Sequence, residues 1–181
     1  MKTELCKLAI KYRVDKTPKI RHSYTPFYHR LFNTKRLLVK KVLEIGIGRT
    51  YKSLKMWEEY FPNAMIYGLD IRCEDKMVSN RIPILQCDQS LKKSLRQLVD
   101  KIGDNFDLII DDGSHIPDHQ IISAKILVSC LNSSGTYIIE DVLNPERVSS
   151  RLSFKTEIYT FNTTKIPDDS IICIRGCSGI I

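Results

Sequence analysis

The chain has 181 residues, a length that suits one domain of ordinary size with its own core. Hydrophobic residues make up 43% of the chain and charged residues 27%, which is close to the globular average and disfavours a disordered or fibrous class. Lys and Arg outnumber Asp and Glu by 28 to 21, so the formal charge of +7 permits an anionic partner without identifying one.

Short apolar runs alternate with amphipathic stretches along most of the chain. The apolar runs predict strands, at residues 41–47, 64–71, 82–88, 106–111, 135–142, 157–161 and 170–174. Stretches with apolar residues at three- and four-residue spacing predict helices at residues 52–60, 90–102 and 118–131. The pattern predicts a single α/β domain over residues 1–181, with a doubly wound, Rossmann-like sheet of seven strands that is mostly parallel.

The end of the predicted sheet differs from its parallel part. The last two strands are joined by about eight residues, among them Pro167, Asp168 and Asp169. A parallel connection through a helix needs a longer segment than this. We therefore predict a C-terminal antiparallel hairpin.

The cysteines and the first residues bear on the compartment. No cysteine pair has C-x-x-C spacing, and the closest pair, Cys173 and Cys177, has no nearby histidine, which disfavours a zinc site. The opening MKTELCKLAIKYRVDK carries charges throughout and lacks the apolar region of a secretory signal. No apolar run approaches the ~20 residues that a membrane span needs. We expect a cytoplasmic protein with reduced cysteines that does not associate with membranes.

The first predicted strand ends in the sequence EIGIG, from Glu44 to Gly48. Its two glycines allow a tight turn and a close approach of the backbone to a ligand. Tyr51 stands where a dinucleotide fingerprint has its third glycine, and no G-K-[ST] follows, so NAD and a P-loop are disfavoured. A G-x-G pair alone is weak support for any ligand.

Acidic residues follow the next two strands. Asp70 and Ile71 end the second strand, where a carboxylate can accept hydrogen bonds from both hydroxyls of a ribose. Asp88 and Gln89 follow the third strand, and they either face an adenine edge or cap the next helix. Together with the G-x-G pair, these positions indicate an adenosine ligand without a pyrophosphate clamp.

Four carboxylates end the fourth and fifth strands, as Asp111 and Asp112 in IDDGSH and as Glu140 and Asp141 in IIEDV. Acids this close repel one another unless a cation or protonation relieves them, and oxygen-rich clusters suit Mg²⁺. His115 lies a few residues from Asp112, where it can act as a general base. Taken singly, each has another interpretation: Asp112 with Gly113 suits a turn, His115 suits a helix start, and Glu140 with Asp141 suits acids of a surface loop. Their coincidence at neighbouring strand ends favours a metal-dependent catalytic site.

These segments resemble a known family. The chain is similar to the class I S-adenosylmethionine-dependent methyltransferases, which have a seven-stranded sheet ending in an antiparallel hairpin. Within that class it resembles the metal-dependent sugar O-methyltransferases of macrolide biosynthesis. The resemblance extends over about residues 8–142 and is carried by Asp15-Lys16, HSYTP with Tyr28, VLEIGIG, SLKMWEEYFPNAMIYGLDI, QCDQS, FDLIIDDGSH and YIIEDV.

The resemblance implies roles for particular residues. Asp112, Glu140 and Asp141 would hold Mg²⁺, and His115, with Asp112 beside it, would serve catalysis by taking the proton of a sugar hydroxyl. Residues 1–36 would form a helical N-terminal arm that closes the cofactor site. The implied S-adenosyl-L-methionine-binding residues are Lys16, Tyr24, Glu44, Gly46, Gly48, Asp70, Ile71, Asp88, Gln89 and Asp111.

Two departures from the family leave the acceptor and the assembly open. The loop after Gly48 is shorter than in the family, and the large N-terminal domain and long insertions of some members are absent from this sequence. We expect a Mg²⁺-dependent O-methyltransferase acting on a sugar hydroxyl of a glycan, glycoside or sugar nucleotide. RNA methylation, a catechol-type acceptor and a non-catalytic adenosine-binding domain are the alternatives. We expect a small-molecule or glycan acceptor as partner, with no nucleic acid or membrane, and leave a homo-oligomer open.

Overall fold

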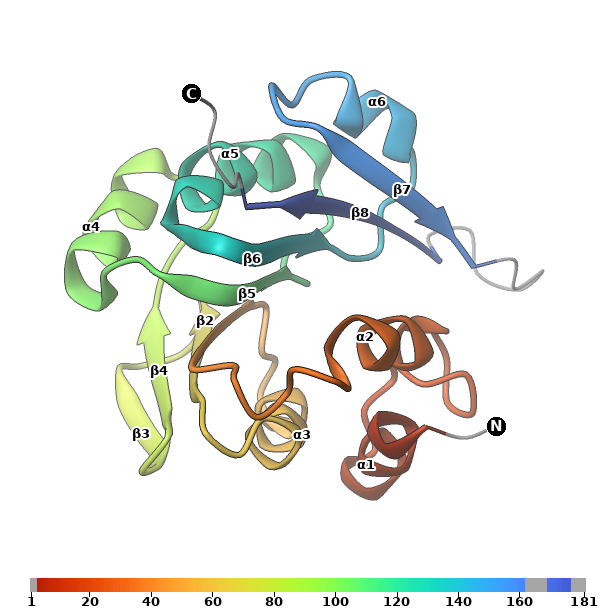
Figure 1. The fold of residues 1–181 in the computed structure, drawn as a ribbon. Coiled ribbons are helices and arrows are strands. Elements are labelled where there is room, and N and C mark those ends of the chain that lie inside the picture. The colour runs from red at the N-terminus through yellow and green to blue at the C-terminus, as the bar shows by residue number, and fades with distance from the viewer. Residues whose placement is uncertain (1–2, 162–168, 177–181) are drawn as a thin grey trace.

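The computed structural model describes residues 3–161 and 169–176. Within them the strands are β1 (Lys41–Ile45), β2 (Met65–Asp70), β3 (Lys76–Ser79), β4 (Ile82–Gln86), β5 (Phe106–Asp111), β6 (Leu131–Ile139), β7 (Thr156–Thr160) and β8 (Ser170–Arg175). They form one sheet of eight strands in the order β3-β4-β2-β1-β5-β6-β8-β7 (Figure 1). Strands β4, β2, β1, β5 and β6 are parallel, which confirms the predicted Rossmann-like class.

Helices cover both faces of this sheet. They are α1 (Glu4–Tyr12), α2 (Tyr24–Phe32), α3 (Lys52–Tyr60), α4 (Lys92–Ile102), α5 (Pro117–Leu127) and α6 (Pro145–Ser149). Helices α1 to α3 lie on one face, and α4 to α6 lie on the other (Figure 1). The sheet is therefore buried on both sides, as its long apolar strands require.

The hairpin predicted at the C-terminal end is confirmed. Strand β7 pairs antiparallel with β8, and β8 pairs antiparallel with β6. Strand β8 thus lies between β6 and the edge strand β7. The connecting residues 162–168, with Pro167 and Asp168, and Cys177 after β8 lie outside the described residues.

The structure corrects the predicted number of strands from seven to eight. The additional strand, β3, pairs antiparallel with β4 at the sheet edge, and it lies in the connection between β2 and β4, where no helix is found among the described residues. Its sequence, KMVS, is short and half exposed, so it lacks the apolar alternation by which buried strands are recognised. Short, charged edge strands are a common protection against pairing with other chains.

The boundary between α5 and β6 also differs from expectation. The helix predicted over residues 118–131 ends at Leu127, and a 3₁₀ turn over Val128–Cys130 leads into β6. Strand β6 begins at Leu131, earlier than predicted. Leu131 pairs with Phe106 of β5, and the register then shifts across a stretch that includes polar Asn132 and Ser133. Polar residues at a bulge hide a strand start from an apolar pattern.

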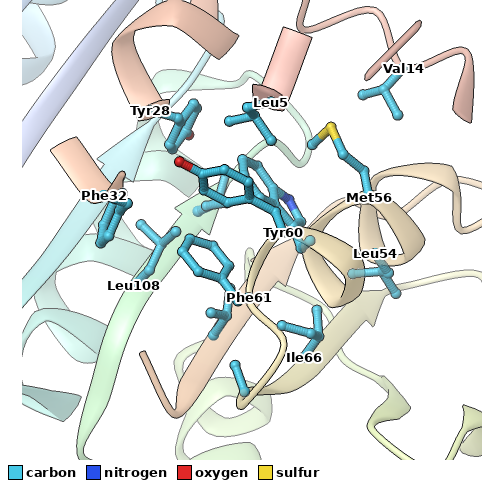
Figure 2. Close-up of a cluster of buried hydrophobic side chains, with 14 of the residues drawn as sticks. Leu5, Val14, Tyr28, Phe32, Leu54, Met56, Tyr60, Phe61, Ile66 and Leu108 are labelled. Atoms are coloured by element: carbon cyan, nitrogen blue, oxygen red, sulfur yellow. The ribbon is translucent and has the colours of Figure 1, made fainter. Parts of the chain in front are cut away.

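The N-terminal helices pack into an aromatic core beneath the sheet. In Figure 2, Tyr28 and Phe32 of α2 lie close to Tyr60 and Phe61 at the end of α3. Tyr28 also meets the ring of Trp57 edge to face, with centroids 5.1 Å apart. Burial of such large side chains contributes strongly to stability. The helices of the N-terminal arm are thereby fixed at the same side of the sheet as α3.

Candidate active site

The order of the strands places a ligand site at one edge of the sheet. The chain runs from β1 outward to β2 and β4 and then returns to β5 on the other side of β1. Ligands of open α/β sheets bind beyond the carboxyl ends of the strands at such a switch in order. Here the first loops meet directly, since the Asp112 N–H donates to the carbonyl of Ile45 at 3.0 Å.

A cavity of about 470 Å³ opens at this edge. Its volume lies in the usual range for small-molecule sites, about 300–1,000 Å³. The cavity brings together the following residues that the sequence indicates as cofactor-binding: Gly46, Gly48, Asp70, Ile71, Asp88 and Gln89.

The two glycines after β1 serve different purposes. Both have a positive φ, 82° at Gly46 and 57° at Gly48, where side chains are disfavoured. A Cβ at Gly46 would lie 2.0 Å from the carbonyl oxygen of Asp112, so this glycine permits the close approach of the two loops. A Cβ at Gly48 would meet no atom within 4 Å, so open space lies above it.

Asp70 and Asp88 are held by their own turns. One oxygen of Asp70 accepts the N–H of Arg72 at 2.9 Å. One oxygen of Asp88 accepts the N–H and the hydroxyl of Ser90, at 2.9 Å and 2.7 Å. Helix α4 begins later, with Leu91 at its N-cap, so Asp88 forms a turn at the cavity and the alternative that it caps the helix is wrong.

Gln89 and Asp111 form a buried link between β5, α5 and the loop that follows β5. The Gln89 amide donates to Asp111 at 3.0 Å and to Ser123 at 3.2 Å, and its oxygen accepts the N–H of Ser114 at 2.7 Å. Burial raises the pKa of Asp111, although the bonds from Gln89 and the Tyr137 hydroxyl oppose that rise. Gln89 therefore holds the loop after β5 in place and lines the cavity.

Asp112 lies on the opposite face from Asp111, because successive residues of an extended strand point to opposite faces. Asp112, His115 and Asp141 each offer a ligand atom within 4.8 Å of the others. The His115 Nε2 lies 4.0 Å from Asp112 and 3.9 Å from Asp141. His115 and Asp141 have φ values of 56° and 52°, a costly conformation that is concentrated at functional sites.

The ammonium group of Lys16 lies inside this acidic cluster. It hydrogen-bonds to Asp112 and Glu140 and lies 3.4 Å from Glu44, while only 2% of its side chain is exposed. Burial opposes its charge, but the carboxylates outweigh burial and hold the pKa of Lys16 well above its usual value. Lys16 thus neutralises part of the charge that the strand ends bring together.

Two tyrosines of the N-terminal arm complete the cluster. The Tyr28 hydroxyl donates to Glu140 at 2.7 Å, and the Tyr24 hydroxyl donates to Asp141 at 2.6 Å. Burial raises the pKa of Glu140 well above its usual value, with Lys16 opposing and Asp112 adding to the rise. Both oxygens of Glu140 already have partners, and Glu140 is not part of the group formed by Asp112, His115 and Asp141.

The residues present suit the groups that the sequence implies. Carboxylate oxygens of Asp112 and Asp141 are ligands that Mg²⁺ prefers. The cavity joins glycine backbone, two carboxylates and the exposed Ile71, a combination that suits an adenosyl group. Glu44 is buried and neither of its oxygens accepts a hydrogen bond from a described residue.

The structure separates some of the residues that the sequence groups together. The cavity lining does not include Lys16, Tyr24, Glu44 or Asp111. It does include residues that the sequence analysis missed, although each stands next to a motif or within the first turn of a predicted helix: Arg49, Tyr51, Arg72, Ser90, Ser114 and His119. The Ser114 hydroxyl and the His119 ring are hydrogen-bonded, with Oγ and Nδ1 2.9 Å apart.

Curated proteins similar to this chain are sugar O-methyltransferases. Mycinamicin VI 2''-O-methyltransferase of Micromonospora griseorubida is 39% identical over 148 residues, which cover 78% of this chain and 36% of that protein. Demethylmacrocin O-methyltransferase of Streptomyces fradiae is 37% identical over 147 residues, covering 78% of this chain and 37% of that protein. The chain thus spans little more than a third of the length of the curated relatives that it matches.

A solved structure with a similar fold is also a methyltransferase. The MycE methyltransferase of the mycinamycin biosynthetic pathway, in complex with Mg and SAH, matches with a TM-score of 0.79 and 25% identity, over 98% of this chain and 55% of that one. No protein-family model matches the chain. The fold of the chain matches that of the MycE methyltransferase, and its strand-end motifs and relatives make it similar to the class I S-adenosylmethionine-dependent methyltransferases. Within that class, it is similar to the macrolide sugar O-methyltransferases.

None of the helices in the described part of the chain is long and apolar enough to cross a membrane.

Proposed function

We propose that this protein is a Mg²⁺-dependent O-methyltransferase that uses S-adenosyl-L-methionine and acts on a sugar hydroxyl of a glycan, glycoside or sugar nucleotide. One observation carries the proposal: the cavity of Gly48, Asp70 and Asp88 adjoins the group of Asp112, His115 and Asp141. A donor site and an acid–base site are thus formed by adjacent strand ends.

The cofactor roles follow the contacts in the cavity. Asp70 has one oxygen bonded within its own turn, and a ribose can use the other as an acceptor. Asp88 and Gln89 would face the adenine, and Gly46 and Gly48 would let the backbone approach the methionine part; all four line the cavity. Glu44, Asp111, Lys16 and Tyr24 support the site from outside the cavity lining.

The acceptor roles belong to the acidic cluster. Asp112 and Asp141, with Glu140 beside them, would hold Mg²⁺, and His115 would take the proton of the acceptor hydroxyl. When bound, the cofactor supplies an activated methyl group and the metal lowers the pKa of a bound hydroxyl. The His115 ring is 40% exposed, so an acceptor can reach it from solvent.

The location and the partners belong to the same proposal. The five described cysteines are free and buried, which agrees with the reducing cytoplasm that we expect. Because the relatives are named for small-molecule acceptors, they favour a glycoside or glycan acceptor over nucleic acid. A homo-oligomer stays open.

The test is methyl transfer from labelled S-adenosylmethionine to a rhamnoside, a catechol and a short RNA, each with Mg²⁺ and with a chelator. We expect transfer to the glycoside only, and its loss on chelation. Transfer to catechol or RNA would replace the sugar with those acceptors. Binding of S-adenosylhomocysteine without turnover on any acceptor would indicate an adenosine-binding domain that is not an enzyme.

A further inference from the structure

Every carboxylate assigned to Mg²⁺ in the proposed function has a partner from one short segment of the N-terminal arm, residues 16–28. Lys16 bonds to Asp112 and Glu140, and Tyr28 bonds to the other oxygen of Glu140. These partners lie 96 to 124 residues away along the chain. The arrangement is a shell of donors around the acids that is separate from the cofactor cavity.

The contacts of Asp141 show how closely this shell is built. The Tyr24 hydroxyl donates to its Oδ1 at 2.6 Å, which leaves Oδ2 towards His115. The ring of His22 stacks on Tyr24, with centroids 4.8 Å apart and planes 16° from parallel. His22 Nδ1 lies 3.5 Å from Asp141 and 3.3 Å from Asp169, so it ties the arm to the residue before β8.

The same division of oxygens holds at Asp112. Its Oδ2 is bonded to Lys16, and its Oδ1 is the oxygen near His115. In both Asp112 and Asp141, a side chain of the arm is bonded to one carboxylate oxygen, and the other oxygen is the one near His115. A bond to one carboxylate oxygen limits rotation of the group and so aims the second oxygen.

We propose that Lys16, Tyr24 and Tyr28 are positioning residues that orient the acids of the metal site. This inference rests on the proposed function, since it needs Mg²⁺ to bind at the cluster. The donors of the arm hold the acids at the spacing in which they bind the ion, without touching the ion themselves. Outer partners of this kind typically change metal affinity about 10–100-fold when removed.

The experiment measures the affinity for Mg²⁺ alone by isothermal titration calorimetry, with no cofactor or acceptor present. The variants are Tyr24→Phe and Tyr28→Phe, each of which removes a single hydroxyl. Tyr60→Phe is the matched control, because Tyr60 is buried in the same aromatic core and its hydroxyl bonds to His29, at 3.0 Å, and not to an acid. Thermal unfolding checks that each variant is folded.

We expect the affinity for Mg²⁺ to fall about tenfold or more in Tyr24→Phe and Tyr28→Phe, and to stay unchanged in Tyr60→Phe. If the wild-type protein binds Mg²⁺ and both tyrosine variants bind it equally well, the inference is wrong and the proposed function stands. If Tyr60→Phe loses as much affinity, the effect belongs to the core and the inference is again wrong. If the wild-type protein binds no Mg²⁺, both the metal dependence in the proposed function and this inference are wrong.

Discussion

The two halves of the candidate site are assembled over very different distances along the chain. The candidate cofactor cavity consists of loops that directly follow β1, β2, β4 and β5, with side chains next to recognisable motifs. In the acidic half, Lys16 reaches Glu140 across 124 positions. Both halves lie at the same edge of the sheet and both use residues at strand ends, but only the acidic half also needs side chains of the N-terminal arm.

The two halves also differ in how far their charged side chains are buried. Asp70 lies in a cavity, where water and ligand can solvate it. Lys16, Glu44 and Glu140 are almost completely buried, so each depends on the others for compensation. Removal of a side chain from the first half should therefore change ligand binding, and removal from the second should change stability or the acid–base step.

The largest effect is expected from His115→Ala. We expect kcat/KM for the methylated acceptor to fall about 10²–10⁴-fold, because the variant lacks the group that takes the hydroxyl proton. The affinity for S-adenosylhomocysteine, measured by calorimetry, should be unchanged, since His115 does not line the cavity. His29→Ala is the control, because His29 is a half-buried histidine of α2 whose ring bonds to the Tyr60 hydroxyl and not to an acid. Full activity of His115→Ala would exclude this residue as the base.

The next effect is expected from Lys16→Met, measured as the free energy of unfolding in urea. Loss of a buried ion-pair partner leaves carboxylates uncompensated and typically costs about 3–5 kcal/mol. Lys11→Met is the control, because Lys11 pairs with Glu59 at the exposed surface and should change stability little.

A second variant shows whether charge is the cause. Adding Glu140→Gln to Lys16→Met removes one of the acids left without a partner, so it should recover part of the lost stability. A double variant that is less stable than Lys16→Met alone would contradict the role of Lys16 as the buried counter-charge.

The smallest effect is expected from Asp70→Asn, which sharpens the comparison from the cofactor side. Loss of a charged acceptor costs about 1.5–3 kcal/mol, so the affinity for S-adenosylhomocysteine should fall about 10–100-fold. Mg²⁺ affinity and unfolding should hardly change. Asp75→Asn, at an exposed position outside the cavity lining, serves as control. An equal loss of Mg²⁺ affinity in Asp70→Asn would mean that the two halves are not separable.

The sequence predicted the parts of the site that depend on local geometry. The G-x-G turn and the acids after β2 and β4 lie at the cavity, because the end of a parallel strand and its loop largely determine where such residues point. The alternation of side chains between the two faces of a strand also predicts that Asp111 and Asp112 point to opposite faces of the sheet. By contrast, nothing local distinguishes Tyr28 from the other aromatic residues of α2, and the resemblance assigned Tyr24 to the cofactor.

By itself, the sequence determined the α/β class, the C-terminal hairpin and the strand-end residues that line the cavity, since these follow from hydrophobic period and motif spacing. Only the tertiary structure decided that KMVS adds an eighth strand and that Lys16, Tyr24 and Tyr28 meet the acids. Those contacts depend on how the aromatic rings of α2 pack against α3 beneath the sheet. Such packing joins distant segments through shape and burial, which a linear pattern does not encode.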